Sequence, residues 1–316
     1  MRAHVIPIGN LANQMLQLVF LERLKQRLPE LEIGGVDLPL WQVRRDFSAG
    51  HPTPRLRLYG QFVDVDRLCS LMQRGWVRDF EFAALGFRME NFLPREQVNA
   101  LFPPRVPVLE RFADDELLIN VRGAEILGDV HQDYGPMPIG YLKQLTDATG
   151  LRPVLMGQIG QDWYSDALRQ AFPGCRVIES RGILEDFEII RHARHIAMSL
   201  STFSWIASWL SEASTIHMPL IGIFNPLQRP EINLLPVDDP RYRFYDFGVR
   251  RWVATPKQVR ALQEPGEWPA LPASAVAERI RGAQQLWSAQ QARYRRRLGV
   301  AAILHRLGWR RRVGIS

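Results

Sequence analysis

Residues 116–125 read ELLINVRGAE, an apolar run that ends in an arginine and a glycine. The run has the length and composition of a buried strand, so we predict a strand over 117–121. Arg122 then follows the carboxyl end of that strand, where the ligands of parallel α/β sheets bind. A guanidinium beside a glycine suits a planar anion with several oxygens, such as a diphosphate. Arg122 is therefore our first candidate for a ligand-binding residue.

The sequence after this strand alternates short apolar runs with helical patterns of about 10 to 15 residues. Such alternation predicts a parallel, doubly wound α/β sheet. The predicted strands are 153–157, 175–179, 195–200 and 216–224, and the predicted helices are 138–149, 162–171, 185–193 and 203–212.

The N-terminal part of the chain predicts a second α/β region. Residues 4–9 resemble a strand, a turn and a helix follow as far as Leu28, and 31–38 resemble the next strand of a βαβ unit. Short helices are expected at 66–74 and 95–101, and the proline-rich segment 102–107 is a predicted hinge. A chain of 316 residues normally divides into two domains, and we place them at 1–110 and 111–255.

Residues 256–316 are predicted to be a basic helical tail, with a helix or helix pair over 276–309. The chain carries a formal charge of +7, but residues 276–316 alone carry +9, which leaves −2 for the rest. Mixed basic and apolar residues suit an in-plane helix on an anionic membrane, while a solvated tail and nucleic-acid binding are the alternatives. Because the body has no basic stripe, a nucleic-acid partner is not expected.

Composition indicates a cytoplasmic protein, with attachment to the inner face of the membrane through the tail. Cys69 and Cys175 are too few for a disulfide scaffold or a zinc site. No apolar run reaches the roughly 20 residues that a membrane span needs, and the N-terminus does not resemble a signal sequence.

Three further segments carry polar groups at predicted helix starts. Asn13 and Gln14 can meet sugar hydroxyls or phosphate, or simply cap the helix. Ser201 and Thr202, with Phe203, offer hydroxyls beside free backbone N–H groups, which suits an anion, although a serine-rich cap is the alternative. One of the carboxylates of Glu185 and Asp186 can accept hydrogen bonds from a purine edge, although acids in the first turn also favour the helix dipole alone.

Metal binding is not predicted. Asp64 and Asp66 match a D-x-D pattern that can hold a divalent cation, but acids are also favoured at the start of a helix. His192 and His195 are three residues apart, and His195 opens an apolar strand, which indicates a structural role.

Taken in order, these segments resemble the fucosyltransferase superfamily, and most closely bacterial α-1,2-fucosyltransferases of glycosyltransferase family 11. Residues 9–17 resemble the motif G-x-G-N-Q-M-F-Q with a longer glycine turn, and 120–125 resemble H-V-R-R-G-D. Asp186 and residues 199–210 resemble an acidic residue followed by N-S-S-F-S-W-W-A-A-W-L. The resemblance covers roughly residues 4–224.

The resemblance implies a GT-B-like fold of two facing Rossmann-like domains, with acceptors at 1–110 and a nucleotide sugar at 111–255. It implies inverting, metal-independent transfer of fucose from GDP-fucose to a glycan hydroxyl in surface polysaccharide synthesis, with a lipid-linked glycan among the acceptors and no cofactor besides the co-substrate. Arg122 would hold the β-phosphate, and Arg122 and Glu125 would be the catalytic residues. The implied donor-binding residues are Gly9, Asn13, Gln14, Arg122, Asp186, Ser201, Thr202 and Phe203.

Two positions depart from the family pattern. Asn120 stands where the family has a histidine, and Glu125 where it has an aspartate. Two alternative hypotheses therefore remain. The protein is a glycosyltransferase that uses another nucleotide sugar, or it is a non-catalytic protein that binds sugar nucleotides or glycans. Inversion needs a base near the acceptor hydroxyl, and the chain proximity of Glu125 and His131 to Arg122 makes them the candidates.

Overall fold

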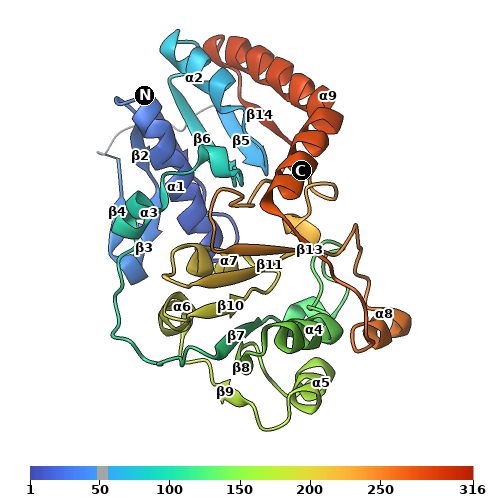
Figure 1. Cartoon of the computed structure of the whole chain (residues 1–316). Helices are drawn as coiled ribbons and strands as arrows, with labels where there is room; N and C mark the ends of the chain where they lie inside the picture. The colour runs from blue at the N-terminus through green and yellow to red at the C-terminus, as the bar shows by residue number, and fades with distance from the viewer. Residues whose placement is uncertain (48–55, 316) are drawn as a thin grey trace. The chain divides into compact units, whose positions relative to one another are not determined.

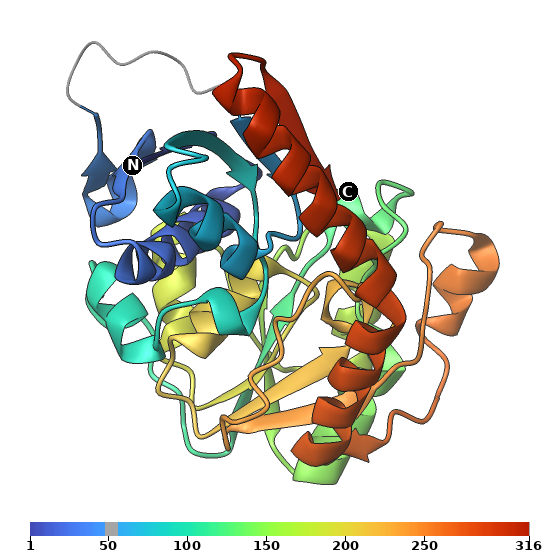
Figure 2. The same ribbon diagram turned by 90° about the horizontal axis from the view of Figure 1, so that it is seen from above.

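The computed structural model describes residues 1–47 and 56–315, and these form two compact units (Figure 1 and Figure 2). Unit 1 contains residues 1–103, 230–234 and 281–316, and unit 2 contains residues 104–229 and 235–280. Each unit has its own sheet of mostly parallel strands connected by helices. The prediction of an α/β chain with two Rossmann-like units is confirmed.

Unit 1 is built on a five-stranded sheet in the order β14-β5-β6-β1-β2, and every neighbouring pair is parallel. Its interior is apolar: the rings of Phe20 and Phe82, for example, stack with centroids 4.8 Å apart. The strands are β1 (Arg2–Val5), β2 (Glu32–Gly34), β5 (Leu56–Gly60), β6 (Asp79–Ala84) and β14 (Arg311–Ile315), with a separate hairpin of β3 (Val36–Leu38) and β4 (Val43–Arg45). The helices are α1 (Leu11–Arg27), α2 (Val65–Gln73) and α3 (Arg95–Leu101), with 3-10 turns η1 (Pro39–Trp41) and η2 (Met89–Asn91).

Unit 2 is built on a seven-stranded sheet in the order β13-β12-β11-β10-β7-β8-β9, in which only β13 runs antiparallel. The strands are β7 (Glu116–Val121), β8 (Arg152–Gly157), β9 (Arg176–Ile178), β10 (His195–Ala197), β11 (Thr215–Leu220), β12 (Tyr242–Asp246) and β13 (Ala270–Leu271). The helices are α4 (Ile139–Thr149), α5 (Trp163–Ala171), α6 (Ile183–Arg191), α7 (Thr202–Trp209) and α8 (Pro256–Ala261), with 3-10 turns η3 (Ala124–Leu127) and η4 (Gly222–Phe224).

The predicted strands and helices of unit 2 are all present, but two strands end earlier than predicted. β10 stops at Ala197 because the following serines turn the chain into α7, where the N–H of Ser199 donates to the hydroxyl of Ser204 at 3.2 Å. β11 stops at Leu220, since Gly222 takes a positive φ of 54° and opens the turn η4. In unit 1, Gly35 (φ 77°) likewise divides the predicted strand 31–38 into β2 and β3.

The C-terminal region differs from the separate tail predicted over 256–316. Residues 256–280 belong to unit 2, in which β13 pairs with β12. Residues 281–316 belong to unit 1, in which β14 pairs with β5 as the edge strand of the sheet. A single helix, α9 (Ala273–Arg306), the long red helix of Figure 2, replaces the predicted helix or helix pair. Apolar residues spaced along α9 are buried, which is why each part of this region belongs to the core of its own unit.

Candidate functional site

The sheet of unit 2 has a topological switch point between β7 and β10. The chain leaves β7 for β8 and β9 on one side, then returns to β10 on the other side. Loops that leave neighbouring strands in opposite directions open a crevice at the carboxyl ends, and ligands of α/β sheets bind there. Arg122 follows β7 and Ser199–Ser201 follow β10, so the structure brings these two predicted segments together.

A buried hydrogen bond connects the two loops at the switch point. The hydroxyl of Ser199 donates to Oδ1 of Asn120 at 2.7 Å, and both side chains are buried. Asn120 is the position at which the resemblance predicts a histidine. Here a neutral amide performs a structural task, because it holds the loop after β10 against the strand that carries Arg122.

Arg122 is largely enclosed by its own loop. Its side chain is 24% exposed, Nη2 donates to Oε1 of Glu125 at 2.8 Å, and the guanidinium carbon lies 5.7 Å from the ring centroid of Tyr134. Nε is buried and makes no hydrogen bond with any residue of 1–47 or 56–315. Buried donors normally have partners, so this unpaired N–H at a switch point keeps Arg122 as a candidate ligand-binding residue.

Glu125 is the ion-pair partner of Arg122. Burial tends to raise the pKa of Glu125, but hydrogen bonds within its own turn and from Arg122 outweigh this effect and lower the pKa. A carboxylate with a lowered pKa is a poor proton acceptor near neutral pH. The geometry therefore favours a role in positioning Arg122 over the predicted role as a base.

Ser201, Thr202 and Phe203 form the beginning of α7. Ser201 is the N-cap, and its hydroxyl oxygen accepts a hydrogen bond from the N–H of Phe203 at 3.1 Å. The ring of Phe203 packs edge-on against Phe187 of α6, with centroids 5.6 Å apart. The capping role is thus present, and the helix dipole still places partial positive charge beside the loop of Arg122.

Asp186 binds its own loop at the start of α6. Its carboxylate accepts hydrogen bonds from the hydroxyl of Ser180 at 2.6 Å and from the N–H of Arg181 at 3.0 Å. Both oxygens are therefore engaged locally, which supports the structural reading of this residue. Its contact with a purine stays a prediction.

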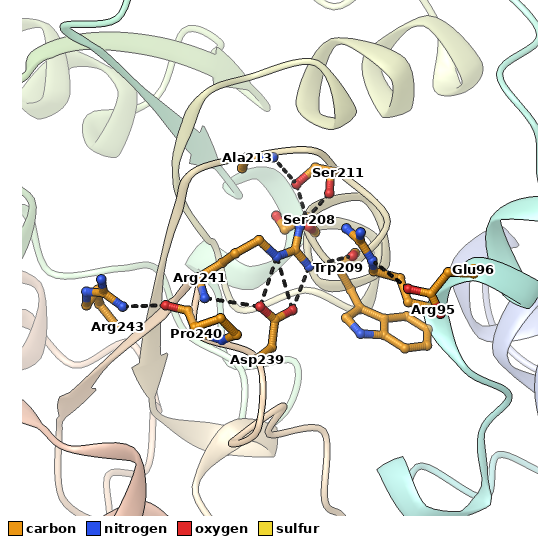
Figure 3. Close-up of polar contacts among 10 residues, drawn as sticks. All are labelled: Arg95, Glu96, Ser208, Trp209, Ser211, Ala213, Asp239, Pro240, Arg241 and Arg243. Atoms are coloured by element: carbon orange, nitrogen blue, oxygen red, sulfur yellow. Dashed lines mark hydrogen bonds and ion pairs between the residues drawn. The ribbon is translucent and has the colours of Figure 1, made fainter.

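Arg241, which precedes β12, binds the carboxyl end of α7 (Figure 3). Nη2 of Arg241 donates to the carbonyl oxygen of Trp209 at 3.0 Å, and Nη1 donates to the carbonyl of Ser211. The same guanidinium binds both carboxylate oxygens of Asp239. Because the last carbonyls of a helix lack partners inside it, a cation at this end holds α7, and with it Ser201, in place.

Two adjoining cavities in unit 2 lie beside Asp133 and share Gln132, Asp133 and Arg251 in their walls. The larger has a volume of about 570 Å³, and the smaller, which has apolar walls, about 220 Å³. Their volumes together suit a small-molecule ligand. The other residues that line the larger are Asp129, Val130, His131, Leu227, Gln228 and Val249, and those that line the smaller include Pro136, Pro138, Leu200, Ile221 and Trp252.

The sequence did not predict a role for Asp133 and Gln228, which line these cavities, or for Tyr134 and Arg229, which follow them in the sequence. Asp133 accepts a hydrogen bond from Gln228 at 2.6 Å and an ion-pair contact from Arg229 at 2.9 Å. Tyr134 follows Asp133 and contacts Arg122; burial raises the pKa of its hydroxyl, and the charges of Arg122 and Arg229 oppose that rise. Gln228 and Arg229 are about a hundred residues from Arg122 in the sequence, and no local pattern marks them.

His131 lines the larger cavity in an orientation that disfavours the predicted role as a base. Its Nδ1 accepts the N–H of Asp133 at 3.1 Å. A neutral imidazole that accepts at Nδ1 carries its proton on Nε2, which makes that nitrogen a donor. His131 is therefore better suited to donate a hydrogen bond to a ligand oxygen.

Gly9, Asn13 and Gln14 gather at the corresponding place in unit 1. They follow β1 at the point where the order of strands changes direction between β1 and β6. Gly9 has φ 65°, and a Cβ there would lie 2.2 Å from Nδ2 of Asn13. Gln14 donates to the carbonyl of Gly9 at 3.0 Å. The glycine therefore permits a tight turn that Gln14 closes.

Gln17, the last residue of the same motif, is a buried structural residue. Its Nε2 donates to the carbonyls of Ile6 at 3.2 Å and Ala84 at 2.9 Å, and its Oε1 accepts the N–H of Ile8 at 3.1 Å. These bonds connect the turn after β1 to the end of β6, which fixes the loop that carries Asn13.

The carboxylates of the D-x-D pattern have arginine partners. Asp64 caps α2 by accepting the N–H of Arg67 at 2.8 Å, and its other oxygen accepts from Nε of Arg295 at 2.8 Å. Asp66 pairs with Arg27 at 2.8 Å. His192 and His195 contact the backbone carbonyls of Glu188 and Asp114. Within the part of the chain that the structure describes, no three His, Cys, Asp or Glu side chains are grouped to hold a metal ion.

No protein-family model and no curated protein matches this chain in sequence. Among solved structures, it is similar to a variant of Arabidopsis thaliana FUT1 in complex with GDP, with 12% identity, a TM-score of 0.39, and coverage of 68% of this chain and 69% of that one. E. coli ADP-heptose lps heptosyltransferase II shows 13% identity, a TM-score of 0.38, and coverage of 91% and 100%. E. coli heptosyltransferase WaaC with ADP shows 12% identity and a TM-score of 0.39. The match covers 90% of this chain and 100% of that one. The α/β assignment depends on the sheets of this chain itself.

Proposed function

We propose that this protein is a glycosyltransferase and that unit 2 binds the diphosphate of a nucleotide sugar at its switch point. The observation that carries the proposal is the buried, unpaired Nε of Arg122 at the carboxyl end of β7. The hydrogen bond between Ser199 and Asn120 holds the segment before α7 beside the end of β7. In this proposal the guanidinium of Arg122 and the N-terminus of α7 bind the same anion. The motif resemblance described above supports the same chemistry.

In this mechanism the protein stabilises the negative charge that grows on the leaving diphosphate. Arg122 donates from Nε to a phosphate oxygen, and the N–H groups of the first turn of α7 add the positive end of the helix dipole. Glu125 keeps the guanidinium oriented before the donor binds. Removal of one such charge-directed donor usually lowers the rate by about 10²- to 10³-fold.

The smaller cavity is the proposed site of the nucleoside. Leu200, which follows β10, and Ile221, which follows β11, lie in its wall together with Trp252 and two prolines. The wall also contains Gln132, Asp133, Arg250, Arg251 and Gln258, and a mixture of apolar and polar groups suits a planar base with hydrogen-bonding edges. The proposed donor is GDP-fucose and the proposed acceptor a glycan hydroxyl, with inversion of configuration, as the motif resemblance implies.

Inversion requires a group that accepts the proton of the acceptor hydroxyl. Glu125 and His131 are both engaged in ways that disfavour this role. Asp129 lies in the wall of the larger cavity and is exposed, so we propose it as the base. A loss of transfer in Asp129→Asn with retained nucleotide binding is the expected result.

Thermal unfolding with GDP, UDP, CDP and ADP tests the donor site. A ligand at about 100 times its Kd stabilises the folded state by about 2.7 kcal/mol, which raises the midpoint measurably. We expect selective stabilisation by one nucleotide in the wild type and none in Arg122→Ala. The matched control is Arg152→Ala, because Arg152 pairs with Asp115 at the opposite, amino end of the same sheet.

Transfer from radiolabelled nucleotide sugars then separates an enzyme from a binding protein. A nucleotide that stabilises the protein without any transfer or hydrolysis of its sugar would favour the non-catalytic alternative. Equal stabilisation of wild type and Arg122→Ala by every nucleotide would contradict the proposed site.

A further inference from the structure

The C-terminal part of unit 1 exposes basic and apolar side chains along α9 and in the segment that follows it, and we call this set of residues the α9 outer face. Its apolar members are highly exposed: Val300 at 56%, Ile303 at 49%, Leu307 at 68% and Trp309 at 58%. Its basic members are also exposed. The face consists of Arg293, Arg296, Arg297, Val300, Ile303, Leu307, Trp309, Arg310 and Arg312.

Helical periodicity places this surface on one side of the molecule's longest helix. Arg293, Arg296, Val300 and Ile303 are separated by three or four residues in turn, and such positions share one side of an α-helix. Leu307 directly follows the helix, and its N–H donates to the carbonyl of Ile303 at 3.2 Å. At 1.5 Å per residue this stripe is about 20 Å long. It passes from arginines to apolar residues toward the C-terminus.

The opposite side of the same helix is packed into unit 1. The rings of Trp287 and Tyr294 lie edge-on to Phe62, with centroids 4.7 and 5.2 Å away. Arg295 binds the buried carboxylate of Asp64 at 2.8 Å. The strand β14, which follows the helix, then pairs with β5. The outer face is therefore a rigid surface of unit 1 and not a detached tail.

The arginines of the outer face have no acidic neighbours in the sequence, because Glu278 is the last acid of the chain. Arg293, Arg296 and Arg297 have no side-chain hydrogen bond or ion pair with any described residue. Arg311 stacks on the ring of Trp309 at 5.3 Å. The charges are thus available to an anionic partner, and Trp309 lies among them.

We propose that the α9 outer face binds the surface of a bilayer that contains anionic phospholipids. Basic residues attract the headgroups, and exposed aliphatic and indole groups enter the interfacial layer. A nucleic acid would also pair with the arginines, but its phosphates offer no apolar environment to Ile303 and Leu307. No helix in the described residues is long and apolar enough to cross a membrane. The proposal does not depend on the identity of the sugar donor.

Vesicle co-sedimentation of the full chain tests the proposal. The wild type is expected to bind vesicles of phosphatidylcholine mixed with phosphatidylglycerol, to bind less as salt is added, and not to bind phosphatidylcholine alone. Arg293→Gln/Arg296→Gln/Arg297→Gln should weaken binding on the order of a hundredfold, at about fivefold per arginine.

Ile303→Ser/Leu307→Ser tests the apolar part and keeps every charge. We expect it to weaken vesicle binding by about tenfold or more. The matched control is Lys25→Gln/Arg74→Gln/Lys143→Gln, which removes three exposed charges elsewhere and should bind like the wild type. Circular dichroism melting verifies that each variant is folded.

The proposal would be overturned if the wild type bound vesicles with and without anionic lipid equally well. It would also be overturned if the control variant lost as much vesicle binding as the triple arginine variant. It would also be overturned if the serine variant bound vesicles as tightly as the wild type while duplex RNA displaced both proteins, because the face would then be a general polyanion site. Nucleotides should stabilise all these variants as much as the wild type, because the proposed nucleotide site lies in unit 2. A failure of the membrane proposal can therefore be distinguished from a failure of the nucleotide-site proposal.

Discussion

Replacing Arg241 by methionine should destabilise unit 2 strongly, because the guanidinium connects the end of α7 to the start of β12 (Figure 3). It donates to the carbonyl oxygens of Trp209 and Ser211 and to both oxygens of Asp239. Methionine keeps most of the aliphatic volume, so the change removes the charge and its hydrogen bonds. The measured loss therefore reports the polar contacts.

The expected size of the loss follows from the burial of the partners. The side chains of Arg241 and Asp239 are 16% and 19% exposed, so water can replace the lost bonds only in part. A hydrogen bond from a charged donor contributes about 1.5–3 kcal/mol, and the helix carbonyls and the carboxylate all lose theirs. Asp239 keeps the N–H of Arg241 as a donor at 3.1 Å, which limits the loss. We expect a decrease of about 3 kcal/mol in the free energy of unfolding.

Chemical denaturation of the wild type, Arg241→Met, Asp239→Asn and the double variant measures this loss and its coupling. Asparagine still accepts a hydrogen bond, so Asp239→Asn should lose only about 1 kcal/mol, with a coupling of about 1 kcal/mol to Arg241→Met. Arg243→Met is the matched control, because Arg243 is exposed and, among residues 1–47 and 56–315, its side chain donates only to the carbonyls of Pro240 and Tyr242. It should change the free energy of unfolding by less than about 0.5 kcal/mol. Equal losses in Arg241→Met and Arg243→Met would refute the reasoning.

Two further predictions concern buried polar side chains. Gln17→Leu should lower the free energy of unfolding by about 3 kcal/mol, because three backbone groups lose their partner, whereas Gln14→Leu, which breaks one exposed bond, should lower it by less than about 1 kcal/mol. Similar values in urea denaturation would count against the structural role of Gln17. Burial, with smaller effects of His195 and Arg243, lowers the pKa of His217 to about 3. Since an unfolded histidine titrates near pH 6.5, the unfolded chain binds more protons below that pH, and stability should fall by up to about 1.4 kcal/mol per pH unit toward pH 3. His217→Asn should flatten this part of the profile, and an unchanged profile would disprove the assignment.

The α/β architecture and the position of Arg122 were readable from local patterns. The apolar runs that became β7, β8 and β11 are bounded by turns or polar residues, and the helices between them show the helical period. An arginine that directly follows such a strand must lie at the carboxyl edge of the sheet, because the direction of a strand fixes which edge its last residue reaches.

The residues that pack around the candidate site could not be predicted from the sequence. Tyr134 contacts Arg122, and Arg229 binds Asp133, because segments distant in the sequence meet at this end of the sheet. Asp64 fitted a metal-binding pattern as well as a helix cap, and its distant partner Arg295 is visible only in the fold. A pattern within a few residues carries no information about which side chain will arrive from elsewhere in the chain.

The sequence by itself determined the class of fold, the strand that directly precedes Arg122, and the basic, partly apolar C-terminal region, since each depends on residue types at short spacing. Only the tertiary structure decided that Asn120 bonds Ser199, that Nε of Arg122 is buried without a partner, and that β14 returns to pair with β5. The physical reason is that periodicity and charge act along the chain, whereas strand order and burial are settled by which surfaces pack together.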